Sequence, residues 1–247
     1  MQRCDHHDWT SEAYVDEWVR RQRAEDPARV ERFQLMCDLL PFQRDATVTI
    51  LDVGAGYGPL SMFILDRYPH ATCIAQDGSE PMLNRARKLM RKYESRFHPH
   101  LSDLFDPDWL PKHLGAFDAV VTSSCLHNLR DFDRIGEIYG EVRRRLKPGG
   151  MFLNLDLVNA PTTGLERRYV TATAARRERA GTSGTDVAAM VRRAGESSTE
   201  GVIGPFPASL DQHLAALAAA GFEDVDCFWK ELRRALFGGY ATPGGLG

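Results

Sequence analysis

The sequence predicts an α/β protein built on a doubly wound, mostly parallel seven-stranded sheet with the last strand antiparallel. Short apolar runs rich in β-branched residues alternate with stretches of helical periodicity, a pattern typical of strands joined by right-handed crossovers. A glycine-rich turn directly follows the first of these runs. The 247 residues suffice for one large domain with a cap. We therefore also expect a helical N-terminal cap and a helical lid insertion.

The residues that flank each apolar run indicate where the strands end. The run 48–53 stops at glycines, and the run 70–76 stops at Asp77-Gly78-Ser79. The run 117–123 is almost wholly apolar, as expected of a strand covered on both faces. A helix is expected to stop at Lys147-Pro148-Gly149-Gly150. The remaining strands are expected at 97–101, 151–158, 225–229 and 234–240, and the main helices at 80–92, 133–146 and 210–220.

Composition divides the chain into four segments, of which the first is a helical cap. Thr10 or Ser11 can begin one helix of this cap, and Asp26-Pro27 a second. The aromatic side chains Tyr14 and Trp18 either pack the cap on the core or line a ligand site. The apolar face of the second helix comprises Val30, Phe33, Met36, Cys37 and Leu40. The four segments are a cap at 1–42, a core at 43–158, a lid insertion at 159–207, and a C-terminal helix and hairpin at 208–247.

The lid insertion is rich in arginine and long for a connection between sheet elements. Two helices are expected in it, at 165–179 and 185–193. Its arginines are partly matched by acidic residues, which favours a solvated helix face. The alternative is a contact with an anionic substrate or a partner.

Composition also excludes several classes of protein. A formal net charge of −3 gives no electrostatic footprint for nucleic acid, and no apolar run is long enough to span a membrane. The N-terminus lacks the apolar core of a signal peptide. Five scattered cysteines without a CxxC pair suit a reducing cytosol. We therefore expect a cytoplasmic protein that binds neither nucleic acid nor membrane.

Two groups of residues carry metal-ligand side chains without a spacing that supports a metal site. One is the N-terminal cluster at 4–8, and the other is the pair His98 and His100 on one face of a predicted strand. The favoured interpretation of both groups is solvated surface. We expect no metal.

The glycine turn predicts a nucleotide-like ligand at the carboxyl end of the first strand. Gly54, Gly56 and Gly58 permit a sharp bend and a close approach of a ligand to the main chain. Their spacing is G-x-G-x-G and Pro59 follows, which departs from the dinucleotide fingerprint G-x-G-x-x-G. A P-loop lysine is absent as well. A nicotinamide oxidoreductase is therefore disfavoured.

Acidic residues stand at the tips of the next two predicted strands. Asp77, 21 positions after Gly56, can accept both hydroxyls of a ribose. Asp103 can accept a hydrogen bond from an exocyclic amine, and the main-chain N–H of Leu104 can reach a ring nitrogen. Either acid alone is more simply a helix cap or loop residue. Together with the glycine turn they indicate an adenosine site at the carboxyl edge of the sheet.

These motifs resemble those of the class I S-adenosylmethionine-dependent methyltransferases. The resemblance covers about residues 45–158 and returns at 221–240. It rests on LDVGAGYG at 51–58, AQDGSEPMLNRAR at 75–87, SDLFD at 102–106, FDAVVTSSCLHNL at 117–129, LKPGGMF at 146–152 and GFEDVDCFWKELRRALFGGY at 221–240. S-adenosyl-L-methionine is the cofactor that the resemblance implies.

The resemblance also implies which residues hold this cofactor. Asp52 and the turn from Gly54 to Gly58 would face the methionine portion, and Asp77 the ribose. Gly78 replaces a commoner apolar residue and would leave the adenine less covered. The other implied contacts are Met82 beside the adenine, Asp103 and Leu104 at its edge, and the Ser123 main chain at the amino group.

A base is also required if the methyl acceptor is a hydroxyl or a protonated amine. His127, just past the fourth strand, is the best-placed candidate, and the alternative is a hydrogen-bonded structural histidine. Asp156 and Tyr240 are weaker candidates, and Cys125 is more simply a packing residue.

The sequence thus predicts a methyltransferase that acts on an oxygen or nitrogen of a small molecule, in a setting such as specialised metabolism. A basic surface and an Asn-Pro-Pro-Tyr signature are absent, which argues against nucleic-acid and release-factor substrates. The alternative is a methyltransferase-like protein that binds the cofactor but catalyses a non-methylating reaction or serves as a partner subunit. Either protein is compatible with a homodimer.

Overall fold

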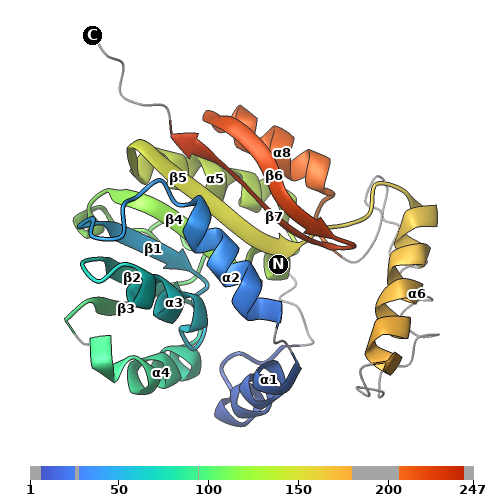
Figure 1. The fold of residues 1–247 in the computed structure, drawn as a ribbon, viewed down its shortest axis with the longest axis horizontal. Helices are drawn as coiled ribbons and strands as arrows, with labels where there is room; N and C mark the ends of the chain where they lie inside the picture. Colours follow the sequence, from blue (N-terminus) through green and yellow to red (C-terminus); the bar gives the residue numbers. More distant parts are fainter. Residues whose placement is uncertain (1–6, 26–27, 94, 180–205, 242–247) are drawn as a thin grey trace.

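The computed structural model describes residues 7–25, 28–93, 95–179 and 206–241, and its core is one seven-stranded sheet (Figure 1). The strand order is β3-β2-β1-β4-β5-β7-β6. Strand β7 is antiparallel to both of its neighbours, and the other pairs are parallel. The predicted fold class is confirmed. The strands are β1 Thr49–Val53, β2 Thr72–Asp77, β3 Phe97–Leu101, β4 Phe117–Ser123, β5 Leu146–Leu157, β6 Phe222–Glu231 and β7 Arg234–Ala241.

Helices cover both faces of the sheet and bury two separate apolar layers. Helices α2 (Ala28–Leu39), α3 (Pro59–Arg67) and α4 (Glu80–Leu89) contribute to one layer. Helices α5 (Phe132–Arg145) and α8 (Leu210–Ala219) contribute to the other. The remaining elements are α1 Glu12–Glu25, α6 Thr163–Arg179 and the short 3₁₀ helices η1 Arg91–Tyr93, η2 Lys112–Leu114 and η3 Leu126–Leu129.

Most helix starts follow from the capping residues that the sequence offers. Ser11 Oγ accepts from the N–H of Tyr14 at 3.3 Å, which selects Ser11 over Thr10 as the cap of α1. Ser209 forms a reciprocal capping box with Gln212 at the start of α8. Pro59 occupies the first turn of α3.

Three local predictions are wrong. Val30 is 48% exposed, whereas Arg32 lies buried on α2 with its guanidinium 5.5 Å from the Trp229 ring centroid. The buried aliphatic stem and the ring contact explain how a charged residue takes that place. The predicted helix 80–92 ends at Leu89 and continues only as η1.

The third error concerns the stop signal at 147–150, which lies inside β5 rather than before it. The helix ends one residue earlier, and β5 begins at Leu146, opposite Phe117. The register shifts before Met151 pairs with Ala119. Gly149 takes up this irregularity with a φ of +75°, and a side chain on Gly150 would meet the Asp118 carbonyl at 2.7 Å.

Parts of the cap and lid predictions lie outside the described residues, namely Asp26-Pro27 and the helix 185–193. The described lid helix, α6, stands to one side of the sheet (Figure 1). One acidic residue of this helix departs from the predicted solvated face, because Glu166 is fully buried and forms an ion pair of 2.8 Å with Arg233.

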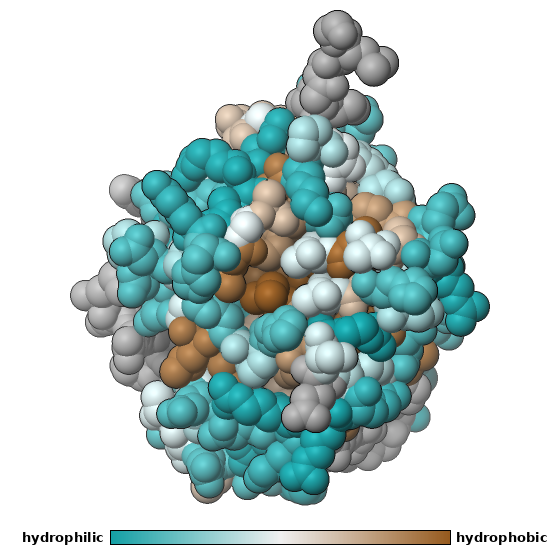
Figure 2. All heavy atoms as spheres, turned by 90° about the vertical axis from the view of Figure 1, so that its left-hand side faces the viewer, coloured by the Kyte–Doolittle hydropathy of each residue, from teal (hydrophilic) through white to brown (hydrophobic). Residues whose placement is uncertain are grey.

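Figure 2 shows the side of the molecule where the parallel strands begin, which lies on the left in Figure 1. Apolar residues gather at its centre and hydrophilic residues surround them.

Among the described helices, none is both long enough and apolar enough to cross a bilayer.

Candidate active site

The glycine turn after β1 has the backbone conformation that its sequence predicts. Gly54, Gly56 and Gly58 have φ values of +64°, +57° and +87°. A side chain on Gly54 would lie 2.1 Å from Cys125 Sγ, so the turn requires glycine there for space as well as for conformation. Cys125 is the packing residue expected, and burial raises the pKa of its thiol well above the ordinary value.

Gln76 holds this turn, a role that the sequence reasoning missed. Its Oε1 accepts from the N–H of Gly54 at 3.1 Å, and its carbonyl accepts from the N–H of Ala55 at 2.9 Å. Its Nε2 donates to the carbonyl of Ser102 at 2.7 Å, which connects the tips of three strands. A polar residue within an otherwise apolar run was the available signal.

A cavity of about 440 Å³ opens at the carboxyl ends of β1, β2 and β4. Nine of the predicted site residues lie in its wall: Asp52, Gly54, Gly56, Asp77, Gly78, Met82, Asp103, Leu104 and Ser123. Two do not. Gly58 is instead the N-cap of α3, where a side chain would lie 3.4 Å from Met90 Cγ. His127 lies beyond the cavity wall, to which its neighbours Leu129 and Asn128 contribute.

Two buried carboxylates of the cavity have neutral hydrogen-bond donors. Asp52 is 1% exposed, and its Oδ2 accepts from Ser61 Oγ at 2.6 Å. Asp77 accepts from the N–H groups of Gly56 and Ser79, each at 2.8 Å. Burial outweighs these bonds and raises the pKa of Asp52 to about 7 and that of Asp77 to about 6. Among the residues that the structure describes, neither carboxylate forms an ion pair with a basic side chain.

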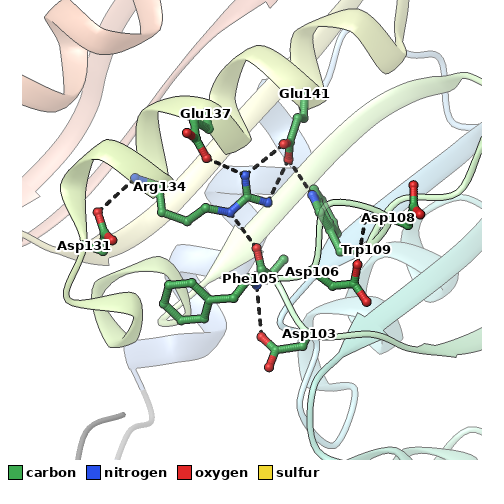
Figure 3. Close-up of polar contacts among 10 residues, drawn as sticks. Asp103, Phe105, Asp106, Asp108, Trp109, Asp131, Arg134, Glu137 and Glu141 are labelled. Carbon is green, nitrogen blue, oxygen red and sulfur yellow. Dashed lines mark hydrogen bonds and ion pairs between the residues drawn. The ribbon is translucent and has the colours of Figure 1, made fainter. Parts of the chain in front are cut away.

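The loop that carries Asp103 and Leu104 is held by Arg134 of α5 (Figure 3). Arg134 Nε donates to the carbonyl of Leu104 at 2.7 Å, and its terminal nitrogens donate to Glu141 at 2.8 and 3.1 Å and to Glu137 at 2.9 Å. Glu141 also accepts from Trp109 Nε1 at 2.5 Å. Trp109 is 1% exposed and anchors the loop.

The N-terminal cap contributes an aromatic wall to the cavity. Trp9 and Trp18 pack edge to face with ring centroids 5.4 Å apart, and Trp18 packs in the same way on Tyr57 at 6.4 Å. Ser79 Oγ donates to the Trp9 carbonyl at 2.6 Å. Trp18 lines the cavity, whereas Tyr14 packs on Trp9. Of the two alternatives predicted for these residues, lining a ligand site therefore holds for Trp18 and packing holds for Tyr14.

His127 and Asp156 form a partly buried acid–base pair where β4 and β5 end. The ring atom His127 Nδ1 lies 2.6 Å from Asp156 Oδ1, and the main-chain N–H of His127 donates to Asp156 Oδ2 at 3.0 Å. Burial acts to raise the pKa of Asp156, but the charge and hydrogen bonds of His127 outweigh it and hold the pKa below its ordinary value. Tyr240 lies elsewhere, on β7 opposite Met151.

The end of the lid insertion packs against this pair. The Phe206 ring meets the His127 ring edge-on, with centroids 5.7 Å apart. Asn159, only 3% exposed, fixes Phe206 because its Nδ2 donates to the Phe206 carbonyl at 2.6 Å and its Oδ1 accepts from the Phe206 N–H at 2.9 Å. The guanidinium of Arg233 lies 5.6 Å from the same ring. Neither Asn159 nor Phe206 carried a recognisable sequence signal.

The arrangement fits an adenosyl cofactor that bears a positive charge. The cavity volume is within the range of small-molecule sites. The two carboxylates without a counter-ion suit a cation. Among the described residues, no group of three or more side chains is placed to hold a metal ion.

Comparisons with known proteins agree with this geometry. Residues 50–150 match a family described as a methyltransferase domain. The chain is 31% identical over 179 residues to malonyl-[acyl-carrier protein] O-methyltransferase of Geobacter sulfurreducens, covering 72% of this chain and 57% of that protein. It is 36% identical over 111 residues to demethylmenaquinone methyltransferase of Leptospira interrogans, covering 44% of this chain and 42% of that protein.

A solved structure shares the fold over most of the chain. The O-methyltransferase family 2 protein of Planctomyces limnophilus, in complex with apigenin, aligns with a TM-score of 0.63 at 20% identity. The alignment covers 96% of this chain and 63% of that one.

Fold and site thus define an α/β protein of the methyltransferase type, with its ligand cavity at the carboxyl ends of the strands. Residues 50–150 match a family of methyltransferase domains, and the chain is similar to S-adenosylmethionine-dependent methyltransferases of class I. It spans about half the length of the curated relatives it matches, 57% of one and 42% of the other.

Proposed function

We propose that this protein transfers the methyl group of S-adenosylmethionine to an oxygen or nitrogen of a small acceptor, and that His127 takes the acceptor's proton. The observation that carries the proposal is the pair formed by His127 Nδ1 and Asp156 Oδ1, 2.6 Å apart beside the cofactor cavity. A carboxylate on Nδ1 fixes the ring and leaves Nε2 as the proton acceptor, which is the arrangement of a general base.

Nine residues of the cavity wall are assigned to the cofactor in this proposal. Asp52 and the glycine turn face its methionine portion, Asp77 accepts from the ribose, and Asp103 and Leu104 meet the adenine edge. When bound, S-adenosylmethionine supplies an electrophilic methyl group on a positively charged sulfur. The protein then has to hold the acceptor in line with that methyl and exclude water.

The names of the relatives do not determine the acceptor. One is named for O-methylation of a malonyl carrier protein, and the other for methylation of demethylmenaquinone. A base beside the cavity favours an acceptor whose oxygen or nitrogen must lose a proton in the reaction. Phe206 covers one edge of the His127 ring, so we infer that the lid insertion contributes to the acceptor side.

The proposal is tested by incubating the full chain with S-adenosylmethionine and a panel of phenols, carboxylic acids and amines, and by measuring S-adenosylhomocysteine release. With an accepted substrate, His127→Ala should lower turnover by about 10²- to 10⁴-fold. Its affinity for S-adenosylhomocysteine should change by less than about threefold, because His127 lies outside the cavity wall. His113→Ala, at an exposed position on η2, is the matched control.

If His127→Ala retained full turnover, His127 would not be the base that takes the acceptor's proton. Conversion of a substrate without S-adenosylhomocysteine release would instead favour the alternative, a protein that uses this fold for a non-methylating reaction.

A further inference from the structure

A buried ion pair joins the lid helix α6 to the turn between β6 and β7, which points toward that helix (Figure 1). Glu166 of α6 is fully buried, and its Oε1 lies 2.8 Å from a terminal nitrogen of Arg233 in the turn. Glu166 Oε2 also accepts from the main-chain N–H of Ala160 at 3.2 Å, and the Arg233 carbonyl accepts from the N–H of Val158 at 2.7 Å. A buried ion pair adds little net stability compared with apolar side chains of similar size, so stability alone does not explain this one.

The guanidinium of Arg233 connects this ion pair with the ring of Phe206. Its carbon lies 5.6 Å from the Phe206 ring centroid, within the range of a cation–π contact. Asn159 fixes Phe206 through the main-chain carbonyl and N–H of that residue. These two bonds hold the chain, so the orientation of the ring depends on its side-chain neighbours.

The Phe206 ring lies against the imidazole of His127 at an interplanar angle of 90°, with centroids 5.7 Å apart. The χ2 torsion of a histidine is intrinsically broad, and the bond from Nδ1 to Asp156 fixes the ring at one atom only. A second contact on the ring limits how far it can tilt about that bond. Such control matters because a misplacement of about 1 Å can lower a rate about 100-fold.

We propose that Arg233 is a positioning residue of the reaction: paired with Glu166, it orients the Phe206 ring, and this ring fixes the plane of the His127 imidazole. The proposal rests on the role of His127 as the base proposed above. It makes α6 a support of the acceptor side, because Glu166 holds the guanidinium that acts on Phe206.

Nuclear magnetic resonance of the full chain with ¹³C-labelled histidine rings tests these contacts without cofactor or substrate. His127→Asn identifies the His127 signals by their loss. Phe206→Leu removes the aromatic ring current and gives the shift of those signals that its loss causes. The double variant Arg233→Met with Glu166→Gln removes both charges and leaves no buried charge without its partner. It should shift the His127 signals in the same direction as Phe206→Leu does.

Turnover measured by S-adenosylhomocysteine release gives the second readout, with an acceptor identified in the assay above. The double variant and Phe206→Leu should each lower kcat by about 10-fold. Affinity for S-adenosylhomocysteine should change by less than about threefold, because none of these three residues lines the cofactor cavity. Phe206→Tyr keeps the ring and should recover most of the turnover that Phe206→Leu loses.

A second ion pair between α6 and β6 provides the matched control. Arg176 and Glu231 lie 2.6 Å apart, but their side chains are 53% and 45% exposed. Arg176→Met with Glu231→Gln removes the same two charges from the same pair of neighbouring segments, and it should keep the wild-type His127 signals and turnover. Arg233→Lys guards against loss of the fold, because it keeps a charge beside Glu166 but not the planar group. It should give a smaller shift in the same direction as the double variant.

Three results would overturn the proposal. The first is an unchanged set of His127 signals in Phe206→Leu, and the second is a shift in Phe206→Leu that neither the double variant nor Arg233→Lys reproduces. The third is a double variant that shifts the signals but keeps wild-type kcat. Absence of turnover with every acceptor would instead reject the proposed function, while the His127 signals would still decide whether Arg233 orients the ring.

Discussion

The two sides of the site hold buried carboxylates in opposite electrostatic states. Asp52 and Asp77, at the tips of β1 and β2, have only neutral donors, and burial raises their pKa values to about 7 and about 6. Asp156, near the end of β5, is 2% exposed and Asp52 is 1% exposed, yet His127 holds the pKa of Asp156 below the ordinary value. Because these two carboxylates are buried to the same depth, the difference between their pKa values comes from the partner.

This contrast indicates what each side still requires. The Asp156 carboxylate already accepts hydrogen bonds from His127, so this side of the site is satisfied without a ligand. The cofactor side has negative charge that the protein does not balance, which favours a cationic ligand. The acids with raised pKa values stabilise the fold below their unfolded pKa near 3.8, and this stabilisation is lost as the pH rises through about 6 to 7.

The strongest test of the contrast is to remove the internal charge of the acceptor side. Asp156→Asn keeps the shape but replaces the carboxylate that orients His127, so turnover should fall by about 10³- to 10⁴-fold. Calorimetry should find nearly unchanged affinity for S-adenosylhomocysteine, because Asp156 does not line the cavity. Loss of cofactor affinity in this variant would show that the two sides are not independent.

The converse change affects the cofactor side. Gly54→Ala forces a side chain to within 2.1 Å of Cys125 Sγ at a residue with φ +64°, so affinity for S-adenosylhomocysteine should fall by about 100-fold or more. Gly136→Ala on α5 is the matched control, because its added side chain would meet nothing within 4 Å and Gly136 does not line the cavity. Equal effects of the two substitutions, measured by calorimetry, would contradict the steric explanation.

The cofactor side also depends on residues that do not line the cavity. Arg134→Met removes the donor to the Leu104 carbonyl and leaves Glu141 without its cation, so S-adenosylhomocysteine should bind about 10-fold more weakly. An analogue with hypoxanthine in place of adenine should lose less affinity in this variant, because it already lacks the amine from which Asp103 is proposed to accept a hydrogen bond. An equal loss for both ligands would indicate general destabilisation, which a thermal melt of the variant would detect.

The smallest expected effect is a pH dependence of cofactor binding. A cation favours the ionised forms of Asp52 and Asp77, so binding of S-adenosylmethionine should release protons and strengthen by about 3- to 10-fold between pH 5.5 and 8. S-adenosylhomocysteine, which lacks the sulfonium charge, should show a weaker dependence. Asp52→Asn should reduce the difference between the two ligands, and an identical pH profile for both would contradict the charge argument.

The cofactor side was largely predictable because its signals are local. The glycine turn, Asp77 and Asp103 each follow directly on an apolar run, and parallel strands bring their carboxyl ends to one edge of the sheet. Nine of the predicted residues accordingly line one cavity. Their assignment to parts of the cofactor stays a prediction.

Residues that act across long sequence separations could not be predicted in the same way. The bond between Arg134 and Leu104 spans 30 positions, and that between Asn159 and Phe206 spans 47. Such pairs depend on how helices pack on the sheet. For the same reason Val30 was assigned to the wrong environment and the burial of Arg32 was missed, because periodicity identifies a helix face but not what covers it.

The sequence by itself determined the succession of strands and helices along the chain, the bend after β1 and the acids at the strand tips. Backbone conformation and periodicity are local properties, so a sequence can reveal them. Only the tertiary structure decided that Gln76 holds the glycine turn, and that His127 pairs with Asp156 beside Phe206. Burial and charge partners are properties of the packed chain, and they set the chemistry of the site.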